Sequence, residues 1–102
     1  MNIAGYQWDQ GNRTKCQKHG VSISEIEGMF LRPVSVFPDV AHSDEEERFI
    51  AISTTEEGRH ILLVFTVREH DGERLIRPVS ARYMHKREVD HYEKEAADVG
   101  QR

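Results

Sequence analysis

The sequence predicts an α+β protein in which an antiparallel sheet of about four strands packs against helices on one side. Between residues 34 and 81, apolar residues alternate with polar ones or run unbroken, as they do in strands. Two stretches before residue 33 predict two N-terminal helices, and the composition of residues 84–97 predicts one C-terminal helix. A chain of 102 residues has room for one modest core. We therefore expect a single domain over residues 1–102, with a flexible tail from about residue 98.

The first helix is predicted from the residues at its two ends. Residues 3–8 have the pattern of a short opening strand, and Asp9 follows them as a capping residue for a polar helix over residues 10–18. Gly20 ends this helix, because glycine readily adopts the left-handed conformation that follows a helix.

The second helix is predicted by capping-box spacings. Ser22 with Glu25, and Ser24 with Glu27, both have the spacing in which a serine and a glutamate satisfy each other's backbone donors. Apolar residues recur at helical intervals on one side: Ile23, Ile26, Met29 and Phe30. We expect this helix to end before Pro33, since the residue before a proline disfavours helical geometry.

Four segments are predicted to form the sheet: residues 34–36, 49–52, 61–67 and 75–81. The unbroken apolar run 61–67 suits a strand buried on both faces, so we place it at the centre. Asp71 and Gly72 supply a tight hairpin turn before the last strand. Pro78 removes one backbone donor from that strand, which implies an edge position or a β-bulge there.

Composition and charge narrow the classes of function. A formal net charge of −4 and a pI of about 5.8 argue against a protein that coats nucleic acid, which is normally basic. The acidic residues concentrate in two stretches, so a local cationic site remains compatible with this charge. Cys16 is the only cysteine, which excludes an internal disulfide, and the longest apolar run, 61–67, is too short to span a bilayer. The expected location is the cytoplasm, with no membrane contact.

Cationic and hydrogen-bonding side chains gather on the first helix and the turn after it: Asn12, Arg13, Lys15, Lys18 and His19. Such a group could bind a phosphate. The alternative is a solvated helix face whose cations offset the negative end of the helix dipole. In that interpretation His19, ahead of Gly20, is a simple C-terminal cap.

A second basic group lies on the last two predicted strands and the residues that flank them: Arg59, Arg68, Arg77, Arg82, His85 and Arg87. Neighbouring strands bring such residues together. In a regular strand Arg77 and Ser80 would point to opposite faces, and a bulge at Pro78 leaves the direction of Arg82 open. The alternative is that these arginines pair with nearby carboxylates in surface ion pairs worth about 0–1 kcal/mol each.

The sequence contains no motif for a metal or a nucleotide cofactor. The six histidines and Cys16 have no spacing typical of metal ligands. There is also no glycine-rich phosphate loop and no Gly-x-Ser-x-Gly motif. We therefore expect neither a metal site nor a cofactor.

Several segments resemble the pattern of the BrnT family of bacterial toxins: Trp8-Asp9, Lys18-His19-Gly20-Val21-Ser22, Glu25, Ile76-Arg77, Ser80-Ala81-Arg82 and Arg87-Glu88. The resemblance extends from about Tyr6 to Tyr92. The block Lys18-His19-Gly20-Val21-Ser22 and the distal Ser80-Ala81-Arg82 are together more specific than either alone. It implies a RelE-like fold and a partner, a BrnA-like antitoxin of the DNA-binding, ribbon-helix-helix type. Contact with DNA would come only through that antitoxin.

The resemblance also implies an activity, namely metal-independent RNA cleavage that inhibits translation, within a type II toxin–antitoxin system. Such cleavage needs a base for the 2′-hydroxyl, cations for the phosphate and an acid for the leaving oxygen, and histidine and arginine suit these roles. We assign His19 to proton transfer and Arg82 to phosphate stabilisation. Candidates for substrate positioning are Lys18, Arg48, Arg77 and His85.

The main alternative is a non-catalytic module, a degenerate toxin that binds an antitoxin and modulates operon repression. The acidic stretches favour it, since a basic antitoxin segment could dock against residues 44–47 or the acidic last helix. A small metal-dependent hydrolase is a third hypothesis, and its activity would be abolished by chelation.

Overall fold

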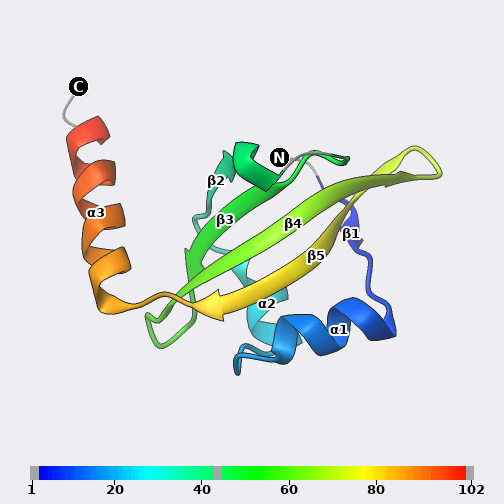
Figure 1. Ribbon diagram of the computed structural model, residues 1–102, viewed down its shortest axis with the longest axis horizontal. Coiled ribbons are helices and arrows are strands. Elements are labelled where there is room, and N and C mark those ends of the chain that lie inside the picture. The colour runs from blue at the N-terminus through cyan, green and yellow to red at the C-terminus, as the bar shows by residue number, and fades with distance from the viewer. Residues whose placement is uncertain (1–2, 43–44, 101–102) are drawn as a thin grey trace.

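The computed structural model describes residues 3–42 and 45–100, and Figure 1 shows how its elements are arranged. In these residues the order is β1 (Gly5–Tyr6), α1 (Gln10–Gln17), α2 (Ile23–Met29), β2 (Ser35–Pro38), a 3-10 turn η1 (Val40–His42), β3 (Phe49–Thr54), β4 (His60–His70), β5 (Glu73–Tyr83) and α3 (Lys86–Gly100). The α+β class, the two N-terminal helices and the C-terminal helix are therefore confirmed. Asp44, in the acidic run at 44–47, lies outside the described residues.

Among the described residues the sheet has five strands, because the expected opening strand joins it as β1, and it is mixed rather than antiparallel. Across the described residues the strand order is β1-β5-β4-β3-β2, with β1 parallel to β5 and the other neighbouring pairs antiparallel. The prediction of about four antiparallel strands is wrong on these two points. The pattern of residues 3–8 predicts the opening strand, but a strand period encodes neither which strand it pairs with nor the direction of pairing. The run 61–67 lies in the central strand, β4, as expected.

Pro78 marks a β-bulge between the two longest strands. Val64 pairs with Ser80, but Phe65 pairs with Pro78, so Val79 is the extra residue. The carbonyl of Pro78 accepts a hydrogen bond of 3.0 Å from the side-chain amide of Asn12, which attaches the start of α1 to the bulged strand. The bulge expected from Pro78 is confirmed.

Both N-terminal helices begin at the predicted capping residues. The Asp9 carboxylate accepts from the Asn12 backbone N–H, and the Asn12 side chain accepts from the Asp9 backbone N–H. Ser22 and Glu25 form the corresponding reciprocal pair at α2. Gly20 has a φ of +92°, the left-handed conformation expected of a residue that ends a helix.

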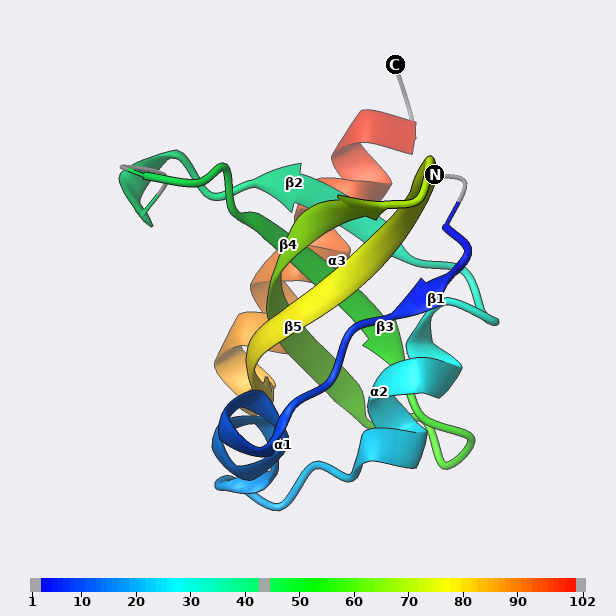
Figure 2. The same cartoon turned by 90° about the vertical axis from the view of Figure 1, so that its right-hand side faces the viewer.

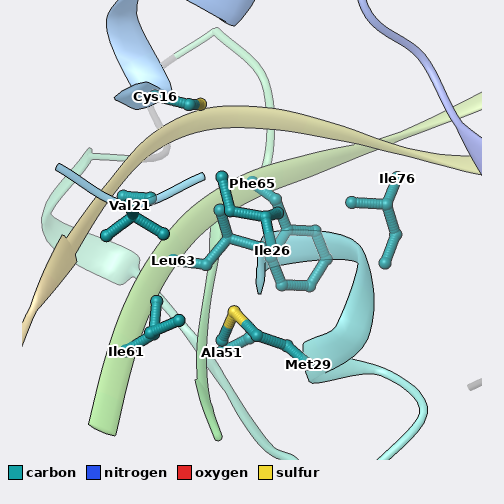
Figure 3. Close-up of a cluster of buried hydrophobic side chains, with 10 residues drawn as sticks. Cys16, Val21, Ile26, Met29, Ala51, Ile61, Leu63, Phe65 and Ile76 are labelled. Carbon is teal, nitrogen blue, oxygen red and sulfur yellow. The ribbon is translucent and has the colours of Figure 1, made fainter. Parts of the chain in front are cut away.

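α1 and α2 cover one face of the sheet, and the core lies between them and the strands. Figure 3 shows side chains of both helices meeting those of the sheet. The buried cluster consists of Cys16, Val21, Ile26, Met29, Ala51, Ile61, Leu63, Phe65, Ile76 and Ala81. Along β4 the fully buried residues alternate with half-buried Leu62 and Val64. The expectation of burial on both faces of this strand is therefore only half met, because no helix packs closely over its second face.

α3 lies toward that second face, so the expectation of helices on one side is wrong. In Figures 1 and 2, α1 and α2 lie below the sheet while α3 rises from the end of β5 in the opposite direction. The Tyr92 ring packs edge-on against Phe37, and its hydroxyl hydrogen-bonds to Ser35. Ser35 and Phe37 alternate along β2 with Val36, which packs against the core. Strand periodicity does not specify which face a following helix approaches.

The C-terminal end of the described chain is helical. α3 runs to Gly100, and residues 101 and 102 lie outside the described residues, so the flexible tail expected from about residue 98 stays a prediction. Within residues 3–42 and 45–100, no helix has the length and apolar character needed to cross a membrane.

Candidate functional site

The face of the sheet that turns away from α1 and α2 carries two of the predicted arginines. On β4, Leu62, Val64 and Thr66 share this face, because they alternate with the buried core residues. Arg82 pairs with Leu62, and Arg77 pairs with Thr66. Both arginines therefore lie on the second face, about 13 Å apart along the strands at roughly 3.3 Å per residue.

A cleft of about 770 Å³ opens on this face. Its walls are the first residues of α1 and the segment that leads into β3, and its floor is formed by β4 and β5. Basic residues of the described lining are Lys15, His42, Arg48, Arg68 and Arg77, and acidic ones are Asp9, Glu45 and Glu46. Four parts of the chain, namely α1, the segment before β3, β4 and β5, thus bring basic groups to one hollow in an acidic protein.

Two of these cations are paired with carboxylates at the edges of the cleft. Arg77 donates to the Asp9 carboxylate at 2.6 Å, and Arg68 donates to both oxygens of Glu46 at 2.7 and 3.0 Å. The Asn12 backbone N–H, followed by Arg77, holds the pKa of Asp9 below its usual value. The hydrogen bond from Arg68 likewise lowers the pKa of Glu46. Exposed pairs of this kind are worth about 0–1 kcal/mol, so an anionic ligand can compete for the guanidinium groups.

Thr66, in the floor of the cleft, has a hydroxyl group without a hydrogen-bond partner among the described residues. The residue is 2% exposed, and its Oγ1 is the one buried side-chain oxygen or nitrogen without a hydrogen-bond partner in the described part of the chain. A buried hydroxyl left unpaired costs about 1–3 kcal/mol. A buried polar atom without a partner is unusual in a folded protein, and this one lies beneath the floor of the basic cleft.

Of the site residues assigned from the sequence, Arg48 and Arg77 line this cleft. The two candidate basic groups contribute further lining residues: Asn12, Lys15 and Arg68. Arg82 lies farther along the same face, where it donates to both oxygens of Glu88 at 2.7 and 2.8 Å. This pairing lowers the pKa of Glu88 to about 2. The backbone N–H of His85 donates to the same carboxylate at 2.9 Å, so His85 and Arg82 meet where β5 leads into α3.

Lys18 and His19 lie elsewhere. Both are exposed in the turn after α1, next to Gly20, whose carbonyl is 3.5 Å from the Tyr83 hydroxyl. Tyr83 packs against the core on the helix-covered face, whereas Arg82 is on the other face. His19 and Arg82 thus approach the same end of β5 from opposite sides of the sheet. The structure does not place them in one pocket.

Sequence reasoning missed Thr66 and did not single out His42 as a site residue. Thr66 is a polar residue within an otherwise apolar central run, which was an available signal. His42 belongs to no sequence motif, and only the tertiary structure brings it to the cleft. Among the described residues, no three His, Cys, Asp or Glu side chains are grouped so that they could hold a metal ion.

The fold and the cleft define a small α+β protein with a basic hollow on the open face of a mixed sheet, suited to bind an anion. A family model described as "Ribonuclease toxin, BrnT, of type II toxin-antitoxin system" matches residues 8–88. This range contains the cleft and most of the sheet, and the chain belongs to the BrnT family of ribonuclease toxins. No curated protein matches the sequence.

Proposed function

We propose that this chain is a metal-independent endoribonuclease, the toxin of a type II toxin–antitoxin system, which inhibits translation by cleaving RNA in the cleft on the open face of the sheet. In this reaction the 2′-hydroxyl attacks the adjacent phosphate, the bond to the 5′-oxygen breaks, and a 2′,3′-cyclic phosphate remains. Membership of the BrnT family supports the class of reaction.

The observation that carries the proposal is the composition of the cleft. Arg48 and Arg77 line it together with Lys15, and the unpaired Thr66 hydroxyl lies at its floor. Guanidinium groups present paired donors that match phosphate oxygens. Arg77 would exchange its contact with Asp9 for a phosphate when RNA enters.

Arg82 is proposed to bind a second phosphate of the RNA. At about 13 Å from Arg77 along the same face, its side chain is suited to a different phosphate of the same strand. The salt bridge to Glu88 would have to open for this contact. Lys18 and His85 remain proposed positioning residues, and the role of His19 in proton transfer also stays a prediction. His19 lies outside the lining of the cleft.

The proposal includes the partner that such a toxin requires. A BrnA-like antitoxin of the ribbon-helix-helix type would bind the toxin in the cytoplasm and carry the complex to operator DNA. The toxin's own net charge of −4 supports the view that DNA is contacted through the antitoxin.

The reaction is tested with the purified chain and an end-labelled RNA in excess EDTA. The proposal predicts cleavage that persists with the chelator and products that end in a 2′,3′-cyclic phosphate. An RNA with a single 2′-deoxy nucleotide at a cleavage position is the matched control, and it should resist cleavage there only. Loss of all activity in EDTA, or cleavage at the deoxy position, would contradict the proposed chemistry.

A non-catalytic, antitoxin-binding role is the second candidate. The pairing of Arg68, Arg77 and Arg82 with carboxylates of the chain itself favours it, because these cations are already partly neutralised. Expression of the chain alone separates the two functions. Growth arrest with RNA cleavage supports the ribonuclease, whereas harmless expression with tight antitoxin binding supports the module.

A further inference from the structure

Asp39 and His42 form a side-chain pair at the rim of the cleft. The Nδ1 atom of His42 lies 3.2 Å from each carboxylate oxygen of Asp39. The His42 backbone N–H also donates to the Asp39 carbonyl at 3.2 Å, within η1. The side chain of Asp39 is 13% exposed and that of His42 is 69% exposed. A largely buried carboxylate thus holds an imidazole that remains open to solvent and to the cleft.

The position of this pair is fixed by the strand beside it. The backbone N–H of Asp39 donates to the carbonyl of Arg48 at 2.8 Å, where the chain enters β3. Arg48 itself lines the cleft, as do His42, Arg77 and Thr66. This backbone hydrogen bond therefore holds the Asp39–His42 pair beside Arg48, which we propose binds the phosphate.

The orientation of the imidazole suits it to accept a proton. When Nδ1–H donates to a carboxylate, the tautomer is set and Nε2 is left as the basic atom on the far side of the ring. Histidine is also the side chain that most often serves as a general base near neutral pH. His42 has the required partner, and it has access to the hollow in which the phosphate would lie.

We propose that His42, oriented by Asp39, is the general base of the cleavage reaction. This inference rests on the proposed ribonuclease function and names a residue for one of its steps. Nε2 of His42 takes the proton of the 2′-hydroxyl as the 2′-oxygen bonds to phosphorus. The bond from phosphorus to the 5′-oxygen breaks, the 5′-oxygen takes a proton from water, and the imidazolium returns its proton to solvent.

The matched control for His42 is His70. Its Nε2 lies 3.4 Å from the carboxylate of Asp71, and its side chain is 70% exposed, much like that of His42. His70 ends β4 at the hairpin and lies outside the lining of the cleft. The two histidines are alike in exposure and in having an acidic neighbour, but His70 contacts Asp71 through Nε2 rather than Nδ1 and does not line the cleft.

The test compares single-turnover cleavage of one RNA by the parent chain, His42→Ala and His70→Ala. The inference predicts a rate lower by about 10²- to 10⁴-fold in His42→Ala and unchanged in His70→Ala. Added imidazole should restore part of the rate in His42→Ala alone, which a purely structural role would not produce. Asp39→Asn should lower kcat by up to about 10⁴-fold with little change in KM, because it affects the tautomer and orientation of His42.

An unchanged rate in a folded His42→Ala variant would overturn the inference, and loss of activity in His19→Ala alongside it would return proton transfer to His19. An RNA with sulfur in place of the bridging 5′-oxygen adds a further check, since its leaving group needs no acid. His42→Ala should remain slow on this substrate, and full recovery would contradict the role as base. An inactive parent chain would contradict the proposed ribonuclease function itself.

Discussion

Arg77 and Arg82 lie on the same face of β5, although residues five positions apart would point to opposite faces of a regular strand. The cause is the bulge, in which Val79 has no partner on β4, so that Arg77 pairs with Thr66 and Arg82 with Leu62. The same bulge puts Ser80 on the face of Arg77, against the expectation that they point apart. The extra residue therefore puts both arginines on one face, whereas regular strand alternation would have put them on opposite faces.

Arg77→Gln should weaken RNA binding without unfolding the chain. If Arg77 contacts one phosphate, the variant also lowers the slope of log K against log salt by about 0.7. Fluorescence titration of a non-cleavable RNA at several salt concentrations measures both effects. Arg74→Gln is the control on the same strand, since Arg74 lies outside the cleft and pairs loosely with Glu69. Equal losses in both variants would contradict a specific contact at Arg77.

Thr66→Val should raise the stability of the folded chain and lower its affinity for RNA. Valine has the shape of threonine without its hydroxyl, so the variant removes an unpaired buried oxygen and should stabilise the folded chain by about 1 kcal/mol. The same variant should bind RNA more weakly, because a hydrogen bond to the ligand is lost. Urea unfolding and RNA titration measure the two quantities. A destabilised Thr66→Val variant would show that the hydroxyl already has a partner in the free protein.

Glu46→Gln should increase affinity for RNA. The substitution releases Arg68, which now donates to both oxygens of the Glu46 carboxylate. The freed guanidinium adds to the positive potential of the cleft, so the gain should be largest at low salt. Glu69→Gln is the control, because it releases Arg74 outside the cleft. A gain of the same size in Glu69→Gln would attribute the effect to net charge alone.

The ion pair between Arg82 and Glu88 predicts a dependence of stability on pH. Arg82 is the main cause that lowers the pKa of Glu88 from 4.5 to about 2. A carboxylate with a depressed pKa in the folded state contributes stability above its unfolded pKa and loses it as the pH falls through the folded value. Glu88→Gln should therefore be less stable than the parent chain at pH 7, and the two should converge near pH 2.

Urea midpoints at a series of pH values test this prediction. Glu95→Gln is the control on the same helix, since Glu95 pairs with His91 at the exposed surface of α3. We expect Glu95→Gln to change the urea midpoint at pH 7 only slightly. If the difference in urea midpoint between Glu88→Gln and the parent chain is the same at pH 2 as at pH 7, the stability does not come from ionised Glu88.

Much of the fold followed from local sequence signals, because those signals are themselves local. The caps at Asp9 and Ser22 depend on residues three positions away, and the bulge depends on the missing donor of Pro78. The parallel pairing of β1 depends instead on contacts with Leu75 and Ile76, about seventy residues along the chain. No local pattern encodes that pairing.

The candidate site was less accessible to sequence reasoning for the same physical reason. Arg48 and Arg77 were named from residue chemistry, and the structure brings both to one cleft. His19 stood out because it lies in a recognisable block, yet the turn after α1 holds it on the other side of the sheet. His42 and Thr66 join the cleft only through the pairing of strands. Their neighbours in space are distant in sequence.

The cleavage rate of the double variant Arg48→Gln and Arg77→Gln, measured in EDTA against Arg74→Gln, tests the central claim most directly. The account predicts that the double variant, while folded, loses nearly all cleavage and that Arg74→Gln cleaves like the parent chain. A double variant that still cleaves RNA at the parent rate would place the chemistry outside the cleft and contradict the account.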